Sequence, residues 1–233
     1  MRINKYLAQC GIGSRRQCDN YIKEGLVKVN GTVVRDFSLS VQKDDYVQYN
    51  NKLIDEKPTV TYMLNKPRGY ICSKNDKYKR KMIYELLPDK NLFSIGRLDY
   101  DTTGLILLTN DGDLCYRLSH PKFEIKKKYF VVTNDKLNNN QINQINQKGL
   151  IVEDNIKLKA KIKFLSKEKT TYFWDVVLTE GKNREIKKIF NYFDIRVLNL
   201  HRYDFGGLLL KNLKEGKYKR INKRELKILD NAN

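Results

Sequence analysis

The sequence predicts an α+β protein with a small N-terminal domain and a larger second domain. Short helical patterns and short strand patterns are scattered along the 233 residues, without a repeat at the period of a solenoid protein. Between Tyr172 and Leu178 every second residue belongs to one apolar face, as in a strand with one buried side. With 40% apolar residues, a chain of this length can bury a sizeable hydrophobic core.

The charge balance favours a polyanionic partner. Lys and Arg number 46 against 27 Asp and Glu, a formal net charge of +19. Such a surplus repels itself in the compact state and attracts polyanions, so nucleic acid is the favoured partner and an anionic membrane surface the second choice. No apolar run approaches the roughly 20 residues of a membrane span, and the first residues lack the apolar core of a signal peptide. We therefore expect a soluble intracellular protein.

The cysteines and histidines do not predict a metal centre. Cys10, Cys18, Cys72 and Cys115 are scattered without a C-x-x-C pair, which favours reduced and mostly buried thiols. Only two histidines are present, and neither has a recognisable nucleophile as a partner. The sequence predicts neither a metal nor a cofactor.

Residues 1–49 read as two short helices followed by a small sheet. Ser14 has the properties of a helix N-cap, and Gln17 three residues later completes a capping box. The pair Asn30-Gly31 predicts a tight turn between two short strands. The polar residues 50–58 read as a linker, and a second domain is expected over residues 59–233.

Four basic residues are expected to gather where the first helix meets the start of the second. Backbone amides at a helix N-terminus together with basic side chains form a natural phosphate site. The alternative is a solvated basic helix face. The predicted set is Arg2, Lys5, Arg15 and Arg16.

The segment 94–113 holds the strongest candidate for a catalytic acid. The apolar run Leu105–Leu108 predicts a buried strand, and a loop with Arg97, Asp99 and Asp101 precedes it. A carboxylate beside a fixed cation stays ionised and can act as a nucleophile or base. Asp99 is the better candidate, and we assign Asp101 to turn chemistry. The alternative is that these are ordinary loop charges beside a strand.

Two further loops carry basic residues. After the strand expected at residues 60–64, Lys66 and Arg68 are predicted at the tip of a loop that could contact a phosphate backbone, or that is simply a solubilised turn. The loop at residues 179–185 contains Lys182 and Arg184 and leads into an amphipathic helix that carries Lys187. We expect a strong positive field at the start of that helix.

Four motifs follow one another in the order of a known family. They are K-P-R-G, then G-R-L-D-Y-D-T-T-G-L-I-L-L-T-N-D-G-D-L, then K-K-Y-F-V, and finally E-G-K-N-R-E-I-K-K-I-F. Together they resemble the RsuA-type ribosomal RNA pseudouridine synthases, and the first module, with S-R-R and L-V-K-V-N-G, resembles the alpha-L RNA-binding module. The resemblance covers nearly the whole chain. It implies a mixed, mostly antiparallel sheet and the isomerisation of uridine to pseudouridine in ribosomal RNA without cofactor or metal.

The resemblance also implies roles for individual residues. Asp99 corresponds to the catalytic nucleophile, and Tyr129 to a tyrosine that stacks on the target base and assists proton removal. Lys187 corresponds to the cation that pairs with the catalytic carboxylate. Where the family usually has Gln and Arg, this chain has Glu185 and Lys187, and a lysine keeps the charge but loses the bidentate fork. Arg97 is expected to hold the RNA backbone or to fill the space that the target nucleotide vacates.

Several alternatives stay open at this level. Asp99 could attack the base, attack the sugar or remove a sugar proton. The K-K-Y-F-V and S-H-P features favour large-subunit over small-subunit RNA only slightly. A catalytically silent RNA-binding or ribosome-assembly protein is the second hypothesis, and a binder of anionic membranes is the third. We expect a monomer in the bacterial cytoplasm, or in an organelle of bacterial descent, that acts on ribosomal RNA or a pre-ribosomal particle away from membranes.

Overall fold

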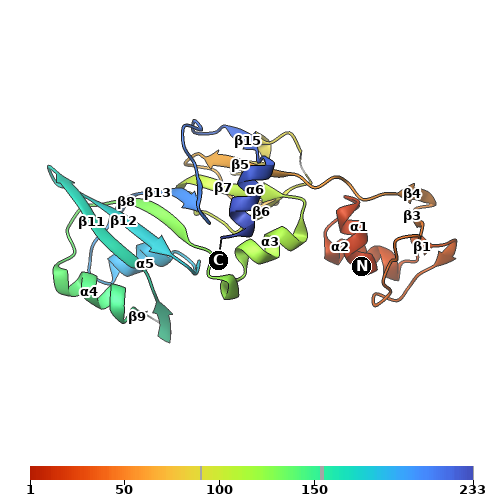
Figure 1. The fold of residues 1–233 in the computed structure, drawn as a ribbon, viewed down its shortest axis with the longest axis horizontal. Helices are drawn as coiled ribbons and strands as arrows, with labels where there is room; N and C mark the ends of the chain where they lie inside the picture. The colour runs from red at the N-terminus through yellow and green to blue at the C-terminus, as the bar shows by residue number, and fades with distance from the viewer. Residues whose placement is uncertain (90, 153–154, 233) are drawn as a thin grey trace. The chain divides into compact units, whose positions relative to one another are not determined.

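A computed structural model describes residues 1–89, 91–152 and 155–232 (Figure 1). The chain forms two compact units, the first made of residues 1–59 with 110–112 and the second of residues 60–109 with 113–233. Within the described part of the chain, no helix has both the length and the apolar character needed to cross a membrane.

The first unit packs two helices on a small antiparallel sheet. Its elements are α1 (Ile3–Gln9), α2 (Arg15–Lys23), β1 (Val27–Val29), β2 (Thr32–Val33), β3 (Val47–Tyr49) and β4 (Lys52–Ile54), and the strand order is β2-β1-β3-β4. The predicted capping box is confirmed, because the Ser14 hydroxyl accepts from the Gln17 backbone N–H and Gln17 Oε1 accepts from the Ser14 N–H at 2.8 Å. The buried side chains of both helices meet those of β1 and β3 in one core.

The stretch predicted as a linker contains β4, so that part of the prediction is wrong. Asn50 and Asn51 both have positive φ angles, 49° and 61°, and they join β3 to β4 as a tight hairpin. Asparagine tolerates this left-handed conformation better than most residues. A pair of such residues between two short strands is a hairpin signal. The predicted domain boundary at residues 58 and 59 stays a prediction.

The second unit is built on a nine-stranded sheet with helices on its faces. The order is β11-β12-β8-β13-β7-β5-β15, with β14 beside β13 and β6 beside β7. All pairs are antiparallel except β13 with β7, which confirms a mixed, mostly antiparallel sheet. The strands are β5 (Thr61–Lys66), β6 (Phe93–Ile95), β7 (Thr103–Thr109), β8 (Lys127–Thr133), β11 (Lys161–Glu168), β12 (Thr171–Leu178), β13 (Val197–Phe205), β14 (Leu208–Leu209) and β15 (Tyr218–Arg220).

Shorter elements complete this unit. A separate two-stranded sheet pairs β9 (Leu150–Val152) with β10 (Ile156–Leu158). The helices are α3 (Gly112–Ser119), α4 (Asn139–Gln147), α5 (Glu185–Asn191) and α6 (Lys223–Asp230), with 3-10 turns at Ile83–Leu86 and Pro121–Phe123.

The central strand β7 is buried on both faces. Ile106 and Leu108 join the core that includes Trp174 and residues of α4 and α5, whereas Leu105 and Leu107 join the core that includes residues of α3 and α6. A strand covered on both sides reads as a continuous apolar run instead of an alternating one. The predicted buried strand at Leu105–Leu108 is therefore confirmed.

Gly104 permits the parallel contact between β7 and β13. It lies opposite Arg202 in the register, with a φ of +107°. A Cβ atom at this position would lie 2.2 Å from the Arg202 carbonyl oxygen and 2.6 Å from its backbone nitrogen. Since backbone atoms cannot move aside as a flexible side chain can, only glycine fits here.

We predict that Gly104→Ala destabilises the protein by about 2–4 kcal/mol, because it combines a strained backbone conformation with a backbone clash. Thermal and urea unfolding of the purified variant measure this loss. Gly112→Ala is the matched control, because no atom lies within 4 Å of a Cβ built at Gly112 in the first turn of α3. A Gly104→Ala variant as stable as the control would contradict this account of the β7–β13 contact.

Candidate active site

A cavity of about 390 Å³ in the second unit brings together the predicted catalytic residues. Its wall is formed by the loop between β6 and β7, by β8 and β13, and by the loop that enters α5. Asp99, Tyr129 and Lys187 all line it, although they come from three separate segments of the sequence.

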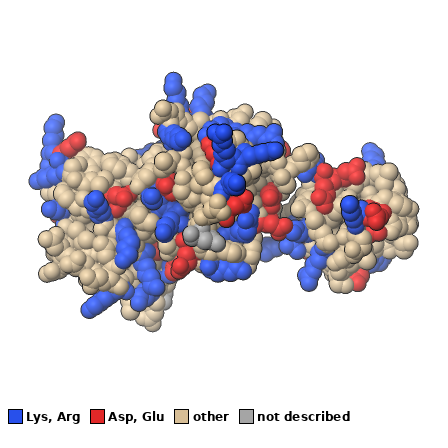
Figure 2. Space-filling model, in the orientation of Figure 1, with Lys and Arg blue, Asp and Glu red and all other residues tan. Residues whose placement is uncertain are grey.

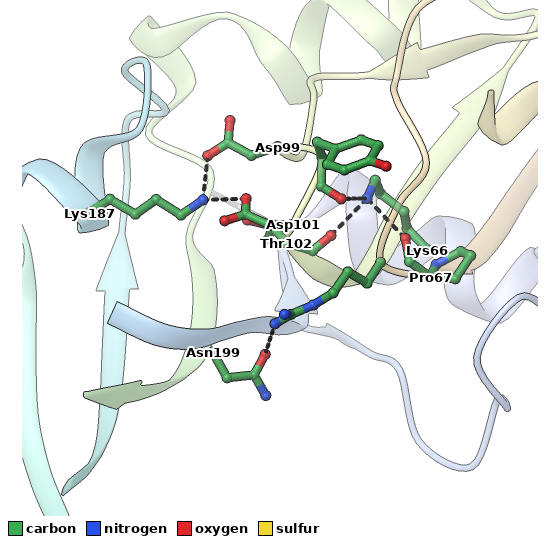
Figure 3. A network of polar contacts seen from close by, with 9 residues as sticks. Lys66, Pro67, Asp99, Asp101, Thr102, Lys187 and Asn199 are labelled. Carbon is green, nitrogen blue, oxygen red and sulfur yellow. Dashed lines mark hydrogen bonds and ion pairs between the residues drawn. The ribbon is translucent and has the colours of Figure 1, made fainter. Parts of the chain in front are cut away.

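The amine of Lys187 bridges two carboxylates of the β6–β7 loop (Figure 3). Its Nζ atom lies 3.2 Å from Asp99 Oδ2 and 2.5 Å from Asp101 Oδ1. The Lys187 side chain is only 12% exposed, against 32% for Asp99 and 53% for Asp101. Burial alone would raise the pKa of Asp101, but the hydrogen bond and charge of Lys187 outweigh it and hold the pKa below its ordinary value.

Asp101 therefore has a partner that the sequence analysis missed. The D-Y-D spacing places both carboxylates on one turn, where the backbone N–H of Thr102 donates to the Asp99 carbonyl at 3.2 Å. A single ammonium group can then contact both carboxylates at once. The spacing itself was visible in the sequence, but the cation comes from α5, far along the chain.

The fully buried Lys66 holds the loop between β6 and β7 through its backbone carbonyls. The Lys66 amine donates to the carbonyl oxygens of Pro67 at 3.0 Å, Tyr100 at 3.4 Å and Thr102 at 2.8 Å (Figure 3). Burial lowers the pKa of Lys66, and the nearby Cys72 and the carboxylates of Asp101 and Asp99 oppose that shift.

The prediction that Lys66 is presented at a loop tip for phosphate contact is thus wrong. β5 extends through Lys66, and the side chain reaches back beneath the loop that carries Asp99 instead of towards solvent. Arg68, two residues later, is exposed, and its Nη2 atom donates to Asn199 Oδ1 at 3.4 Å.

Glu185 anchors the start of α5. Its side chain is buried, and Oε2 accepts from the Lys182 backbone N–H at 3.0 Å, while Oε1 has no partner among the described residues. Burial raises the pKa of Glu185. Arg184, before it, adopts a left-handed conformation with φ 52°. This bend lets Lys187 enter the cavity one turn later, whereas Lys182, Arg184 and Arg97 line its exposed rim.

Two cations that the sequence analysis missed lie near Tyr129, the buried Arg202 and the half-buried Lys127. Arg202 is opposite Tyr129 in the β8–β13 register, and its Nη1 atom lies 3.5 Å from the Tyr129 hydroxyl oxygen. Lys127, on the same face of β8, donates to the carbonyls of Thr179 and Glu180 at 3.1 and 3.2 Å. Burial, and then the charge of Arg202, lower the pKa of Lys127 to about 8. Alternation along the strands could have indicated both positions, because Arg202 lies two residues after Leu200 and Lys127 lies two residues before Tyr129.

Basic side chains are also distributed over the remaining surface. On the face drawn in Figure 2, lysine and arginine predominate over carboxylates. In the first unit, Arg15 donates to Asn4 Oδ1 at 3.3 Å and so links the start of α2 to α1. Arg2 and Arg16 are exposed and Lys5 is half-buried.

Comparison with known proteins identifies the family. Residues 59–192 match the family described as RNA pseudouridylate synthase, and residues 1–47 match the S4 domain. The chain belongs to the RsuA-type pseudouridine synthases.

Relatives and a solved structure match along nearly their whole length. The ribosomal large subunit pseudouridine synthase B of Bacillus subtilis is 34% identical over 232 residues, which cover 98% of this chain and 95% of the relative. An uncharacterized RNA pseudouridine synthase of Rickettsia conorii is 36% identical over 233 residues, which cover 99% of this chain and 99% of the relative. A crystal structure of a pseudouridylate synthase superposes with a TM-score of 0.71 at 30% identity, covering 98% of this chain and 99% of that one.

In this pseudouridine synthase, Lys66 should be essential to the stability of the Asp99 loop. We predict that Lys66→Met lowers the free energy of unfolding by about 2–4 kcal/mol, because it leaves buried carbonyls without a donor. Chemical denaturation measures the loss. Lys148→Met, at an exposed position of the same unit, is the control and should change stability by less than about 0.5 kcal/mol. Equal stability of the two variants would show that the buried amine does not support the loop.

Proposed function

We propose that this pseudouridine synthase isomerises one uridine of ribosomal RNA, with large-subunit RNA as the favoured substrate and Asp99 as the nucleophile. The observation that carries the proposal is the Asp99 carboxylate held by Lys187 at a cavity that Tyr129 also lines. The cavity lies in the size range of small-ligand sites, roughly 300–1,000 Å³, and so suits one extruded nucleoside. The name of the Bacillus subtilis relative supports the choice of the large subunit.

The target uridine has to leave its stack before it can reach Asp99. Extrusion of a base costs a few kcal/mol. Phosphate contacts from basic side chains offset this cost, because each releases condensed counterions. In our proposal the rim residues Arg97, Lys182 and Arg184 and the exposed Arg68 supply such contacts in the second unit. The proposed set in the first unit is Arg2, Lys5, Arg15 and Arg16.

Within the cavity, the ion pair with Lys187 at 3.2 Å holds the Asp99 carboxylate in place. Asp99 then opens the glycosidic linkage, by attack on the base, by attack on the sugar or by removal of a sugar proton. The N1–C1′ bond breaks, the base turns while it is stacked on Tyr129, and a C5–C1′ bond forms. Loss of the C5 proton and gain of a proton at N1 complete the isomerisation, so that no cofactor is consumed.

We also propose that the protein acts as a monomer on ribosomal RNA or a pre-ribosomal particle. Its place would be the bacterial cytoplasm, or an organelle of bacterial descent, away from membranes. Support comes from the match of the first 47 residues to the S4 domain and from the large positive charge.

We predict that Asp99→Asn abolishes pseudouridine formation and leaves RNA binding intact, because the amide cannot act as a nucleophile but has nearly the same shape. The substrates are separated small- and large-subunit RNA from cells that lack the gene, and pseudouridine is measured by chemical mapping. Asp101→Asn is the matched control, since it also removes a carboxylate from Lys187 but keeps Asp99. We expect that control to retain activity.

An Asp99→Asn variant that converts uridine at the wild-type rate would refute the assignment of the nucleophile. Wild-type protein that binds RNA but forms no pseudouridine in either subunit RNA would instead favour the catalytically silent RNA-binding hypothesis.

The role of the first unit can be tested through salt dependence. We predict that Arg15→Gln together with Arg16→Gln makes the slope of log affinity against log salt shallower by about 1.5, because two phosphate contacts are lost. Fluorescence anisotropy with labelled ribosomal RNA fragments measures the slope. Lys43→Gln with Lys52→Gln removes the same charge from two other exposed positions of this unit. If the double substitution of Arg15 and Arg16 leaves the slope unchanged, these two residues do not contact phosphate.

A further inference from the structure

Arg202 is a buried cation that takes part in no step described so far. The residue is 2% exposed and lies in the wall of the cavity beside Tyr129. Its guanidinium is fixed by a 2.7 Å hydrogen bond from Nε to the Leu105 carbonyl, and its Cζ atom lies 5.1 Å from the centre of the Phe205 ring. The guanidinium therefore has one defined position in the wall of the cavity.

This cation has no carboxylate partner within 4.0 Å in the part of the chain that the structure describes. Asp204 lies two residues further along β13, beyond an irregularity in the β8–β13 register; it is 3.7 Å from the Lys128 amine and accepts from the Gly207 N–H at 3.1 Å. The Nη2 atom of Arg202 makes no hydrogen bond to any described residue. A buried charge without a counterion is costly. Its retention at this point calls for a role in the site.

The Tyr129 hydroxyl is the polar group that faces Arg202. The Nη1–Oη distance of 3.5 Å is at the upper limit for a hydrogen bond, as is common in active sites before substrate binds. A guanidinium can only donate, so the Tyr129 oxygen accepts from it and the hydroxyl proton must point elsewhere. Among the described residues the hydroxyl has no second hydrogen-bond partner, and Tyr129 lines the cavity.

We propose that Arg202 is a positioning residue that acts through Tyr129, directing its hydroxyl proton to the base and stabilising the phenolate that forms when this proton is transferred. The inference rests on the proposed function and goes beyond it. It names a residue on another strand, Arg202 on β13, as the group that determines the direction in which the Tyr129 hydroxyl donates its proton.

The step in which Arg202 acts follows formation of the C5–C1′ bond. The ring then has a C5–H bond and an N1=C6 double bond. The Tyr129 hydroxyl gives its proton to N1, and the resulting phenolate takes the proton from C5. The C5–H bonding pair becomes the C5=C6 double bond, and the N1=C6 π pair becomes the N1 lone pair. Tyr129 ends protonated, and the guanidinium faces the negative oxygen only in between.

A purely structural role for Arg202 is the competing explanation. Its Nε bond to Leu105 joins β13 to β7 and could serve only to hold the two strands together. That role predicts a loss of folded protein and an equal loss of activity whether or not Tyr129 has its hydroxyl. The two explanations therefore differ in a double-mutant cycle with Tyr129→Phe.

The experiment measures single-turnover pseudouridine formation by full-length protein on ribosomal RNA that carries either protium or deuterium at C5 of uridine. We expect Arg202→Met to lower the rate at least about tenfold with unchanged RNA affinity, within the range that a proton-transfer residue supplies. We also expect the deuterium isotope effect to rise, because C5 proton removal becomes rate-limiting. In the Tyr129→Phe background the same substitution should change the rate less than about twofold. Arg224→Met, at an exposed position, is the matched control.

Two results would overturn the inference. One is an equal fold-loss from Arg202→Met in both backgrounds, and the other is a slower rate with an unchanged isotope effect. If Arg202→Met does not fold, Arg202→Lys takes its place in the same cycle, because lysine keeps the charge but not the fork that binds Leu105. Inactive wild-type protein would refute the proposed function. If the wild type is active but the effects of Arg202→Met and Tyr129→Phe are additive, only the role of Arg202 is refuted.

Discussion

The site depends on the contact of the Lys187 ammonium group with two carboxylates. This ammonium group meets Asp99 and Asp101 from α5, while both carboxylates belong to a loop some 86–88 residues earlier in the chain. One cation between two carboxylates restricts their rotation, and it holds the pKa of Asp101 below its ordinary value. Because the Lys187 side chain is 12% exposed, water screens this contact less than it would on an open surface. The ion pair therefore joins α5 to the loop between β6 and β7 and restricts the orientation of the Asp99 carboxylate.

Two features of the backbone make this contact possible. Lys66 fixes the carbonyls of Tyr100 and Thr102, so the loop that carries the carboxylates rests on a buried charge. Gly104, directly after the loop, lets β13 lie against β7 and brings Arg202 beneath Tyr129. The G-R-L-D-Y-D-T-T-G motif is thus a structural unit as well as the one that carries the proposed nucleophile. Its two carboxylates meet the Lys187 amine, and its last glycine permits the close approach of the neighbouring strand.

Local features of the structure were predictable because local physics determines them. The capping box of Ser14 and Gln17 depends on residues three apart, and the burial of Leu105–Leu108 follows from an apolar run of strand length. Asp99 stood out because an acid lies directly before that strand. The family resemblance supplied the mixed topology, and the comparisons confirmed it.

Contacts between distant segments were not predictable in the same way. Lysine is ordinarily exposed, and the burial of Lys66 requires carbonyls from a loop more than 30 residues away. The partner of Asp101 and the pairing of Arg202 with Tyr129 likewise depend on strand order and register, which short sequence patterns do not determine. β4 was missed because its signal is a pair of asparagines instead of a glycine turn.

The central claim is that Asp99, held by Lys187, converts one ribosomal uridine. The most direct measurement is a pseudouridine map of all ribosomal RNA from cells that lack the gene and carry either the wild-type copy or the Asp99→Asn copy. The account predicts one modified position, favoured in the large subunit, that is absent without the gene, returns with the wild-type copy and stays absent with the variant. Identical maps from the two complemented strains would contradict it.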